Sequence, residues 1–145
     1  METVTYPRSP KRLLGGIAHL GRLIDKIRLR HAGQIQDYNY LTVGFDKYLL
    51  ELFGLNGEAL ESRVLQGGTD EDIVHWVNSH ARPLSDEDIR QWNHRILTSG
   101  PQDDAARQRF QARLHDIAAK RGVEIDALPP VATWVDVIEL DEGRL

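Results

Sequence analysis

The hydrophobic and polar positions between Ser9 and Gly33 follow a helical repeat, and the pattern predicts one long amphipathic helix here. Ser9 is a typical N-cap, and Pro10 suits the first helical position. Gly33 can adopt the left-handed conformation that ends a helix. The apolar residues recur at spacings of three and four, which places them on one face: Leu13, Ile17, Leu20, Ile24 and Ile27. We expect the remaining elements to pack against this face.

Helical patterns continue along the chain, separated by glycines, prolines and polar loops. The expected helices cover 45–53, the residues after an Asn56 cap, 70–80, 86–98, the stretch between Asp103 and Gly122, and a short segment from 134. A strand is the alternative for the last segment, but no other segment offers it a partner strand. Residues 1–8 are expected to be extended, and 123–132 to form a proline-containing connector. The sequence therefore predicts an all-α single domain over 1–145, an irregular bundle of about seven helices with short connections.

Two short acidic clusters, 70–72 and 86–88, follow Thr69 and Ser85. Acidic clusters are typical of metal sites, but a hydroxyl side chain followed by acids is also what the first turn of a helix requires. We interpret both clusters as helix starts.

Composition excludes several classes of site. The chain has no cysteine, so it has neither disulfides nor thiolate metal ligands. No two of its six histidines have the i, i+4 spacing of a helical zinc site, and neither a phosphate-binding loop nor a nucleophile motif is present. We expect no metal and no cofactor. The N-terminus shows no targeting or membrane segment, which indicates a cytoplasmic location.

The net charge of −4 is unevenly distributed. Residues 1–31 carry seven basic and two acidic residues, whereas the remainder carries eleven basic and twenty acidic ones. One basic set is expected to be exposed, away from the apolar face: Lys11, Arg12, Arg22, Lys26 and Arg30. Binding to nucleic acid is disfavoured, because the acidic parts of the same chain can neutralise this set and no aromatic residues are interleaved with it. We expect Asp141 and Glu142 to reach back to the basic helix.

Polar residues within apolar stripes are the candidates for a site. Asp25 and Arg28 lie one turn apart on the first helix, and Asn93 lies at an inward spacing beside Trp92. Such groups need partners, which either a structural network or a ligand can supply. The ligand-binding candidates are Arg28, Asp25, Tyr38, Tyr40, Trp92, Asn93, Trp134 and Asp136.

Three functions are compatible with these residues. The first is a protein that binds a small anionic molecule between the first helix and the Tyr38–Tyr40 loop, where Arg28 holds the anion. Whether such a site would also catalyse a reaction stays open. The second is a protein-interaction module in which the polar network is structural. The third is binding of nucleic acid or another anionic surface through the basic helix, which ranks lowest.

Short motifs spread over nearly the whole chain resemble a known bacterial family. The motifs include Tyr6-Pro7-Arg8-Ser9-Pro10, Asp25-Lys26-Ile27-Arg28, Gly44-Phe45-Asp46, Gly68-Thr69-Asp70-Glu71, Trp92-Asn93, Thr133-Trp134-Val135-Asp136 and Asp141-Glu142-Gly143-Arg144. In these the chain resembles the family catalogued as domain of unknown function 5069. The resemblance implies a bacterial, single-domain and mainly helical protein, and it implies no activity.

Overall fold

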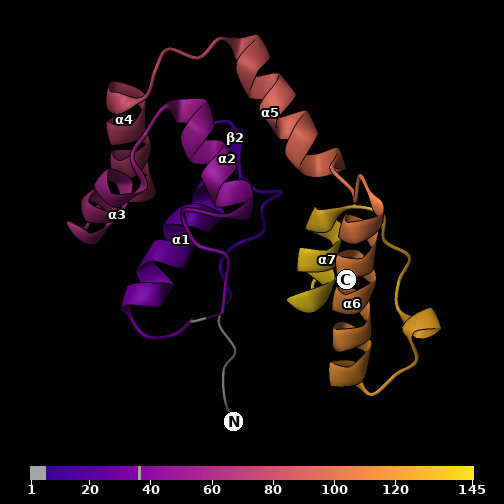
Figure 1. Ribbon diagram of the computed structural model, residues 1–145. Coiled ribbons are helices and arrows are strands. Elements are labelled where there is room, and N and C mark those ends of the chain that lie inside the picture. The colour runs from indigo at the N-terminus through magenta and orange to yellow at the C-terminus, as the bar shows by residue number, and fades with distance from the viewer. Residues whose placement is uncertain (1–5, 36) are drawn as a thin grey trace. The chain divides into compact units, whose positions relative to one another are not determined.

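The computed structural model describes residues 6–35 and 37–145, and in this part of the chain it contains seven α-helices and two very short strands (Figure 1). The predicted all-α class is confirmed. The chain divides into two compact units, residues 1–96 and 97–145, each of which is described by itself. Most of the expected extended segment, residues 1–5, lies outside the described residues.

The prediction of one long helix is wrong for its first half. Residues 13–18 form a β-hairpin in which β1 (Leu13–Leu14) pairs antiparallel with β2 (Ile17–Ala18). Helix α1 begins only after the hairpin and covers Leu20–His31. The apolar residues at helical spacing therefore belong to two different elements.

The glycine pair between the strands explains the difference. Gly15 and Gly16 have φ angles of +60° and +79°, the left-handed values that a two-residue hairpin turn requires at both central positions. A helix would have to hold these glycines at negative φ and would gain no side-chain packing from them. The sequence signal for a hairpin, Gly-Gly between apolar pairs, was thus present in the chain.

The remaining helices of the first unit confirm the sequence prediction. They are α2 (Gly44–Phe53), α3 (Gly57–Leu65), α4 (Asp70–His80) and α5 (Asp86–Thr98). Helix α1 packs against α3, and α3 against α4. The fully buried side chains of this unit come from all five helices and include Leu20, Leu23, Ile24, Ile27, Leu49, Phe53, Leu60, Ile73, Val77 and Ile96.

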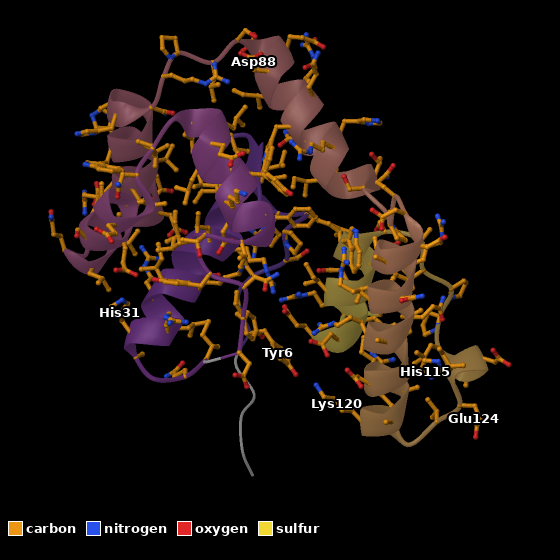
Figure 2. All side chains as sticks on the ribbon, in the orientation of Figure 1. Tyr6, His31, Asp88, His115, Lys120 and Glu124 are labelled. Carbon is orange, nitrogen blue, oxygen red and sulfur yellow. The ribbon has the colours of Figure 1, made fainter. Side chains whose placement is uncertain are left out.

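The acidic clusters are helix starts, as expected. The Thr69 hydroxyl accepts from the backbone N–H of Asp72, while the Asp72 carboxylate accepts from the N–H of Thr69. Ser85 and Asp88 make the same reciprocal pair at the start of α5, where Figure 2 labels Asp88. These backbone hydrogen bonds stabilise the ionised carboxylates and lower the pKa of Asp72 and of Asp88.

The second unit pairs α6 (Asp104–Arg121) with α7 (Trp134–Asp141), joined by a connector that contains a 3-10 turn, η1 (Ile125–Ala127). The helical alternative for the last segment is confirmed. The core of this unit consists of Phe110, Leu114, Ile117, Val137 and Leu140.

Asp141, one of the two C-terminal acids expected to reach the first helix, has partners within its own unit. Its carboxylate forms ion pairs with Arg113 and Lys120 of α6, at 3.4 and 3.6 Å. Both partners lie on α6, which belongs to the same unit as α7. Among the described residues, none of the helices is long and apolar enough to cross a membrane.

Candidate functional site

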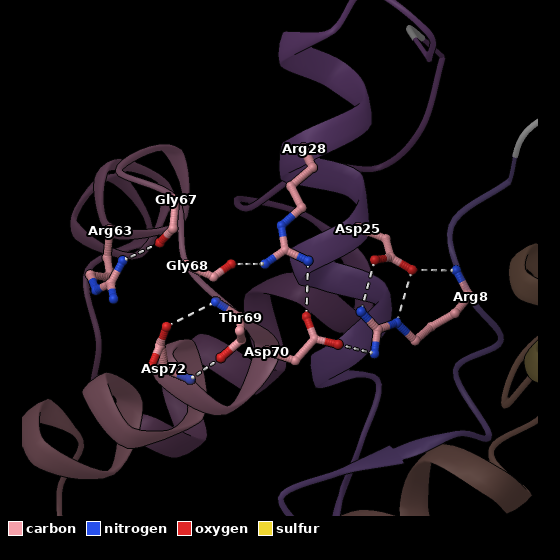
Figure 3. Close-up of polar contacts among 9 residues, drawn as sticks. All are labelled: Arg8, Asp25, Arg28, Arg63, Gly67, Gly68, Thr69, Asp70 and Asp72. Carbon is pink, nitrogen blue, oxygen red and sulfur yellow. Dashed lines mark hydrogen bonds and ion pairs between the residues drawn. The ribbon is translucent and has the colours of Figure 1, made fainter.

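Asp25 and Arg28 both belong to an ion-pair network that joins three parts of the first unit (Figure 3). The Asp25 carboxylate accepts from the backbone N–H, Nε and Nη2 of Arg8, each at 2.9 Å. Arg8 also reaches Asp70 at the start of α4, again at 2.9 Å. Arg28 binds the other oxygen of Asp70 at 2.9 Å. The network is therefore a chain of alternating charges, Asp25–Arg8–Asp70–Arg28.

This network satisfies its own charges, since two arginines face two carboxylates. The hydrogen bond from Arg8 is the main cause that lowers the pKa of Asp70, with Arg28 adding to it. Arg28 is the most exposed member, with 36% of its side chain accessible, and its second nitrogen points to the Gly68 carbonyl at 3.5 Å. The arrangement fixes the N-terminal segment and α4 onto α1.

The two tyrosines of the loop before α2 contact arginines of α1. The Arg22 guanidinium lies 5.6 Å from the ring centre of Tyr38, and that of Arg30 lies 4.4 Å from the ring centre of Tyr40. The Tyr40 hydroxyl donates to Glu61 of α3. Burial, together with this carboxylate, raises the pKa of Tyr40. His31, at the C-terminal end of α1 (Figure 2), lies 3.5 Å from the same glutamate.

Trp92 and Asn93 hold the hairpin onto α5. The indole N–H of Trp92 donates to the Ala18 carbonyl at 3.0 Å. The Asn93 amide accepts from the N–H of Ala18 at 2.8 Å and donates to the Gly16 carbonyl at 2.9 Å. Both side chains therefore satisfy backbone groups of the short β-ribbon.

Trp134 and Asp136 lie in the second unit. The Trp134 ring packs edge-on against Phe110 with ring centres 5.2 Å apart, and contacts the core of that unit. Asp136 lies in the first turn of α7, and its N–H donates to the Thr133 hydroxyl at 3.1 Å. Their described contacts are those of a core aromatic and a helix start.

Sequence reasoning missed the cluster with the most unusual environment, which consists of His19, Lys26 and Asp46. Oδ1 of Asp46 lies 2.6 Å from Nε2 of His19 and 2.9 Å from Nζ of Lys26. His19 is 1% exposed and Asp46 is fully buried, while the Lys26 side chain is 6% exposed. We call these three residues the buried centre.

Local structure explains how three charged or polar groups meet here. His19 directly follows β2 and is the N-cap of α1, with φ of +72°, a left-handed conformation that is rare for a side-chain-bearing residue. Its N–H donates to the Pro10 carbonyl at 3.0 Å, which fixes the turn. Lys26 lies two turns further along α1, and Asp46 lies in the first turn of α2. Strained backbone of this kind occurs often at functional sites.

The charges of the buried centre determine the protonation of His19. Burial lowers the pKa of His19, which the hydrogen bond to Asp46 only partly opposes. Burial raises the pKa of Asp46, but the hydrogen bond from His19 and the charge of Lys26 outweigh it and hold the pKa below its usual range. Asp46 is thus a carboxylate and His19 a neutral imidazole whose Nε2–H donates to it.

The second nitrogen of His19, Nδ1, is buried and has no hydrogen-bond partner within 6–35 and 37–145. In the neutral form with the proton on Nε2, Nδ1 is an acceptor, and it is buried without a donor among the described residues. A buried acceptor left unsatisfied costs free energy, and a ligand, an ordered water or a functional role can account for it in a native structure. The His19 ring also contacts the edge of Phe45, with ring centres 5.7 Å apart.

The loop that carries Tyr38 and Tyr40 is held on the buried centre by backbone hydrogen bonds. The Asn39 carbonyl accepts from Lys26 Nζ at 2.9 Å, and the Leu41 N–H donates to Oδ2 of Asp46 at 3.1 Å. Leu41 itself has a positive φ of 54°. The loop backbone therefore occupies hydrogen-bonding positions of both charged groups.

The prediction that the whole basic set is exposed to solvent is partly wrong. Arg22 and Lys26 are buried, because the Tyr38–Leu41 loop covers this side of α1 as well. Lys11, Arg12 and Arg30 are exposed. Two of the five basic side chains that the nucleic-acid hypothesis requires on the surface are therefore not available there.

A signal for the buried centre was present in the sequence. His19 interrupts the apolar run Ile17-Ala18-His19-Leu20, and Asp46 lies in the Gly44-Phe45-Asp46 motif. The assumption of a continuous helix from Ser9 concealed it, because on that helix His19 lies beside the apolar stripe and not at a chain reversal.

Neither a metal cluster nor a deep cavity marks another site. In the ranges 6–35 and 37–145, no three histidine or acidic side chains converge as metal ligands. In the second unit a hollow of about 370 Å³ lies between α6 and the connector, lined by residues such as Leu114, Ile125, Leu128 and Pro129. It is open to solvent, and its polar side chains are Gln111 and Asp126.

Comparison with known proteins identifies the family. No curated protein matches the chain. The family model described as "Domain of unknown function (DUF5069)" matches residues 4–144, which include the hairpin, the ion-pair network and the buried centre. The chain therefore belongs to the family of the domain of unknown function DUF5069.

Proposed function

We propose that this protein binds a small anion at the buried centre, beneath the Tyr38–Leu41 loop. One observation carries the proposal: Nδ1 of His19 is a buried acceptor that has no partner in the described part of the chain, and it belongs to the same cluster as a buried lysine. A ligand with an anionic oxygen and an O–H group supplies what both residues require. Its oxygen accepts from Lys26 Nζ in place of the Asn39 carbonyl, and its O–H donates to Nδ1.

The buried position strengthens such contacts. A hydrogen bond to a charged group gains more in a water-excluded site than in bulk water. The loop must open first, so the apparent affinity is the intrinsic affinity multiplied by the fraction of molecules in which the loop is open. Both Arg28 and Lys26 already contact a carboxylate at 2.9 Å, but the Lys26 side chain is 6% exposed and lies at the buried centre, whereas that of Arg28 is 36% exposed, so we assign the role to Lys26.

The test compares phosphate with sulfate in thermal melts at matched ionic strength. The two anions are similar in size and charge, but only phosphate carries an O–H at neutral pH. We expect phosphate to raise the melting temperature of the wild type and of Arg28→Met more than sulfate does. Lys26→Met should lose this difference, and Lys47→Met, which removes an exposed lysine of α2, should keep it.

Two outcomes contradict the proposal. In the first, phosphate and sulfate act alike on the wild type, which means a general salt effect. In the second, Arg28→Met abolishes the phosphate effect and Lys26→Met retains it. Because the wild type and Arg28→Met give an answer by themselves, the test stands even if Lys26→Met fails to fold.

A second candidate is a protein-interaction module. The observation that favours it is the Asp25–Arg8–Asp70–Arg28 network, whose charges are matched within the chain and leave no evident task for a ligand there. Under this interpretation His19 has only a structural role, and small anions bind at it no better than at the exposed histidines.

A bacterial origin and a cytoplasmic location are further proposals. The first is supported by the family resemblance, and the second by a chain without cysteine. Fractionation of cells that express the native gene tests the location directly.

A further inference from the structure

We propose that His19 is a general base, whose Nδ1 takes a proton from the O–H group of the bound anion. The inference rests on the proposed function and extends it from binding to acid–base chemistry.

The geometry of the buried centre is that of an oriented base. The Asp46 carboxylate accepts from Nε2–H at 2.6 Å, which fixes both the tautomer and the ring orientation and leaves the lone pair of Nδ1 free. An imidazole held by a carboxylate at one nitrogen and basic at the other is the general arrangement for proton abstraction. The hydrogen bond to Asp46 and the edge contact with Phe45 both orient the ring.

The proton transfer balances within the buried centre. The O–H bond of the ligand breaks, its proton forms an N–H bond at Nδ1, and the electron pair stays on the ligand oxygen. The new imidazolium is stabilised by Asp46, while Lys26 Nζ faces the negative charge that develops on the ligand. No further reactant is needed for this step.

The surroundings of His19 keep its imidazole neutral, which is the form that can accept a proton. The charged groups that act on the ring are Asp46 of α2, which favours its protonation, and Lys26 and Arg22 of α1, which oppose it. Burial is the main cause that lowers the pKa of His19 and the two cations add to it, so the imidazole is neutral at pH 7 before the ligand arrives. The anionic ligand then shifts the balance toward protonation when it is bound.

Access requires that the loop release Lys26, together with the contacts that its two tyrosines make with Arg22, Arg30 and Glu61. The Asn39 carbonyl occupies the position on Lys26 that the ligand oxygen would use, whereas the Leu41 N–H donates to Asp46 and stays in place. Tyr38 is partly exposed and Asn39 is exposed, so this part of the loop lies near the surface. The bound anion replaces the Asn39 carbonyl on Lys26.

Alkylation with bromoacetate tests the inference, because this probe combines an anionic carboxylate with a carbon that basic nitrogens attack. The chain has no cysteine, so no thiol competes for the reagent. In the reaction an Nδ1–carbon bond forms, the carbon–bromine bond breaks and bromide leaves. The neutral analogue bromoacetamide is the matched reagent, and five exposed histidines serve as internal controls: His31, His75, His80, His94 and His115.

We expect bromoacetate to modify His19 at Nδ1 about tenfold faster than it modifies the exposed histidines, with a rate that saturates and that phosphate slows. Bromoacetamide should modify His19 more slowly than the exposed histidines. The bromoacetate rate at His19 should fall in Lys26→Met and persist in Lys47→Met. Peptide mapping by mass spectrometry measures all of these rates in one sample.

Two results overturn the inference in distinguishable ways. If bromoacetate modifies the exposed histidines and spares His19, Nδ1 is not an accessible base, whereas the phosphate effect on melting still decides the proposed function. If both reagents modify His19 equally fast, the buried centre has no preference for anions, and the base and the proposed function fall together.

Discussion

Asp25 and Arg28 lie three residues apart on α1 and are linked through Arg8 and Asp70, which come from two other segments of the chain. A pair that looks local in sequence is thus part of a tertiary clamp (Figure 3). Its central member is Arg8, because its guanidinium contacts both carboxylates. Four charges arranged in alternation hold the N-terminal segment, α1 and α4 together.

Removing Arg8 should therefore destabilise the protein more than removing Arg28. Arg8→Met leaves two partly buried carboxylates without their shared cation, which we expect to cost roughly 1–3 kcal/mol. Arg28→Met removes one half-exposed contact and should cost less than about 1 kcal/mol. Urea denaturation measures both, with Arg90→Met at an exposed helical pair as the control. A larger loss in Arg28→Met would contradict the central role of Arg8.

Replacing the two glycines of the hairpin turn should destabilise the protein to different extents. Both Gly15→Ala and Gly16→Ala force a side chain into left-handed backbone, at about 1 kcal/mol each. A Cβ at Gly15 would also lie 2.9 Å from a methyl group of Val74, whereas nothing lies within 4 Å of one at Gly16. Gly15→Ala should be the more destabilising change, and Gly16→Asn the mildest, because asparagine tolerates positive φ. Equal losses for both alanine variants would mean that Val74 moves aside without cost.

The buried His19 should make the stability depend on pH below its ordinary pKa of 6.5. Because burial lowers the pKa of His19 in the folded state, the unfolded chain binds this proton first as the pH falls. The free energy of unfolding should therefore decrease below about pH 6.5, by at most about 1.4 kcal/mol per pH unit. Asp46, whose pKa is also lowered, loses its contribution at more acid pH.

Denaturation between pH 5 and 8 measures this dependence in the wild type, His19→Gln and His75→Gln. Glutamine can still donate to Asp46 but does not titrate, so His19→Gln should flatten the curve. His75 is exposed on α4, and its replacement should leave the curve unchanged. A wild-type stability that is constant across this range would show that His19 is not held neutral by burial.

Replacing Asn93 should destabilise the protein even when the new residue is aspartate. Asn93→Asp keeps an acceptor for the N–H of Ala18 but loses the donor to the Gly16 carbonyl and places a carboxylate beside it. We expect a loss of roughly 1–2 kcal/mol at neutral pH that becomes smaller when the aspartate is protonated in acid. Chemical denaturation at two pH values checks this prediction. A neutral effect at both would mean that the hairpin does not depend on this clamp.

Local sequence signals by themselves determined most of the secondary structure. Caps such as Thr69 with Asp72 and Asn56 with Ala59, together with helix ends at Gly54 and Gly122, act within a few residues. Phe110, Leu114 and Ile117, which line the buried face of α6, also follow a helical spacing in the sequence. These features depend on near neighbours in the chain, so they could be predicted without knowing the fold.

Only the tertiary structure decided where the polar residues of the first unit meet. The reversal at Gly15–Gly16 turned one apparent helix into a hairpin and a shorter helix, which moved His19 from beside a stripe to a buried cap. Lys26 looked exposed because its burial depends on a loop more than ten residues away in sequence. Asp25 and Arg28 looked like partners because helical spacing shows neighbours on one element and not the residues that another segment brings. Contacts between distant segments depend on how the elements pack, and the repeat of a single helix does not contain that information.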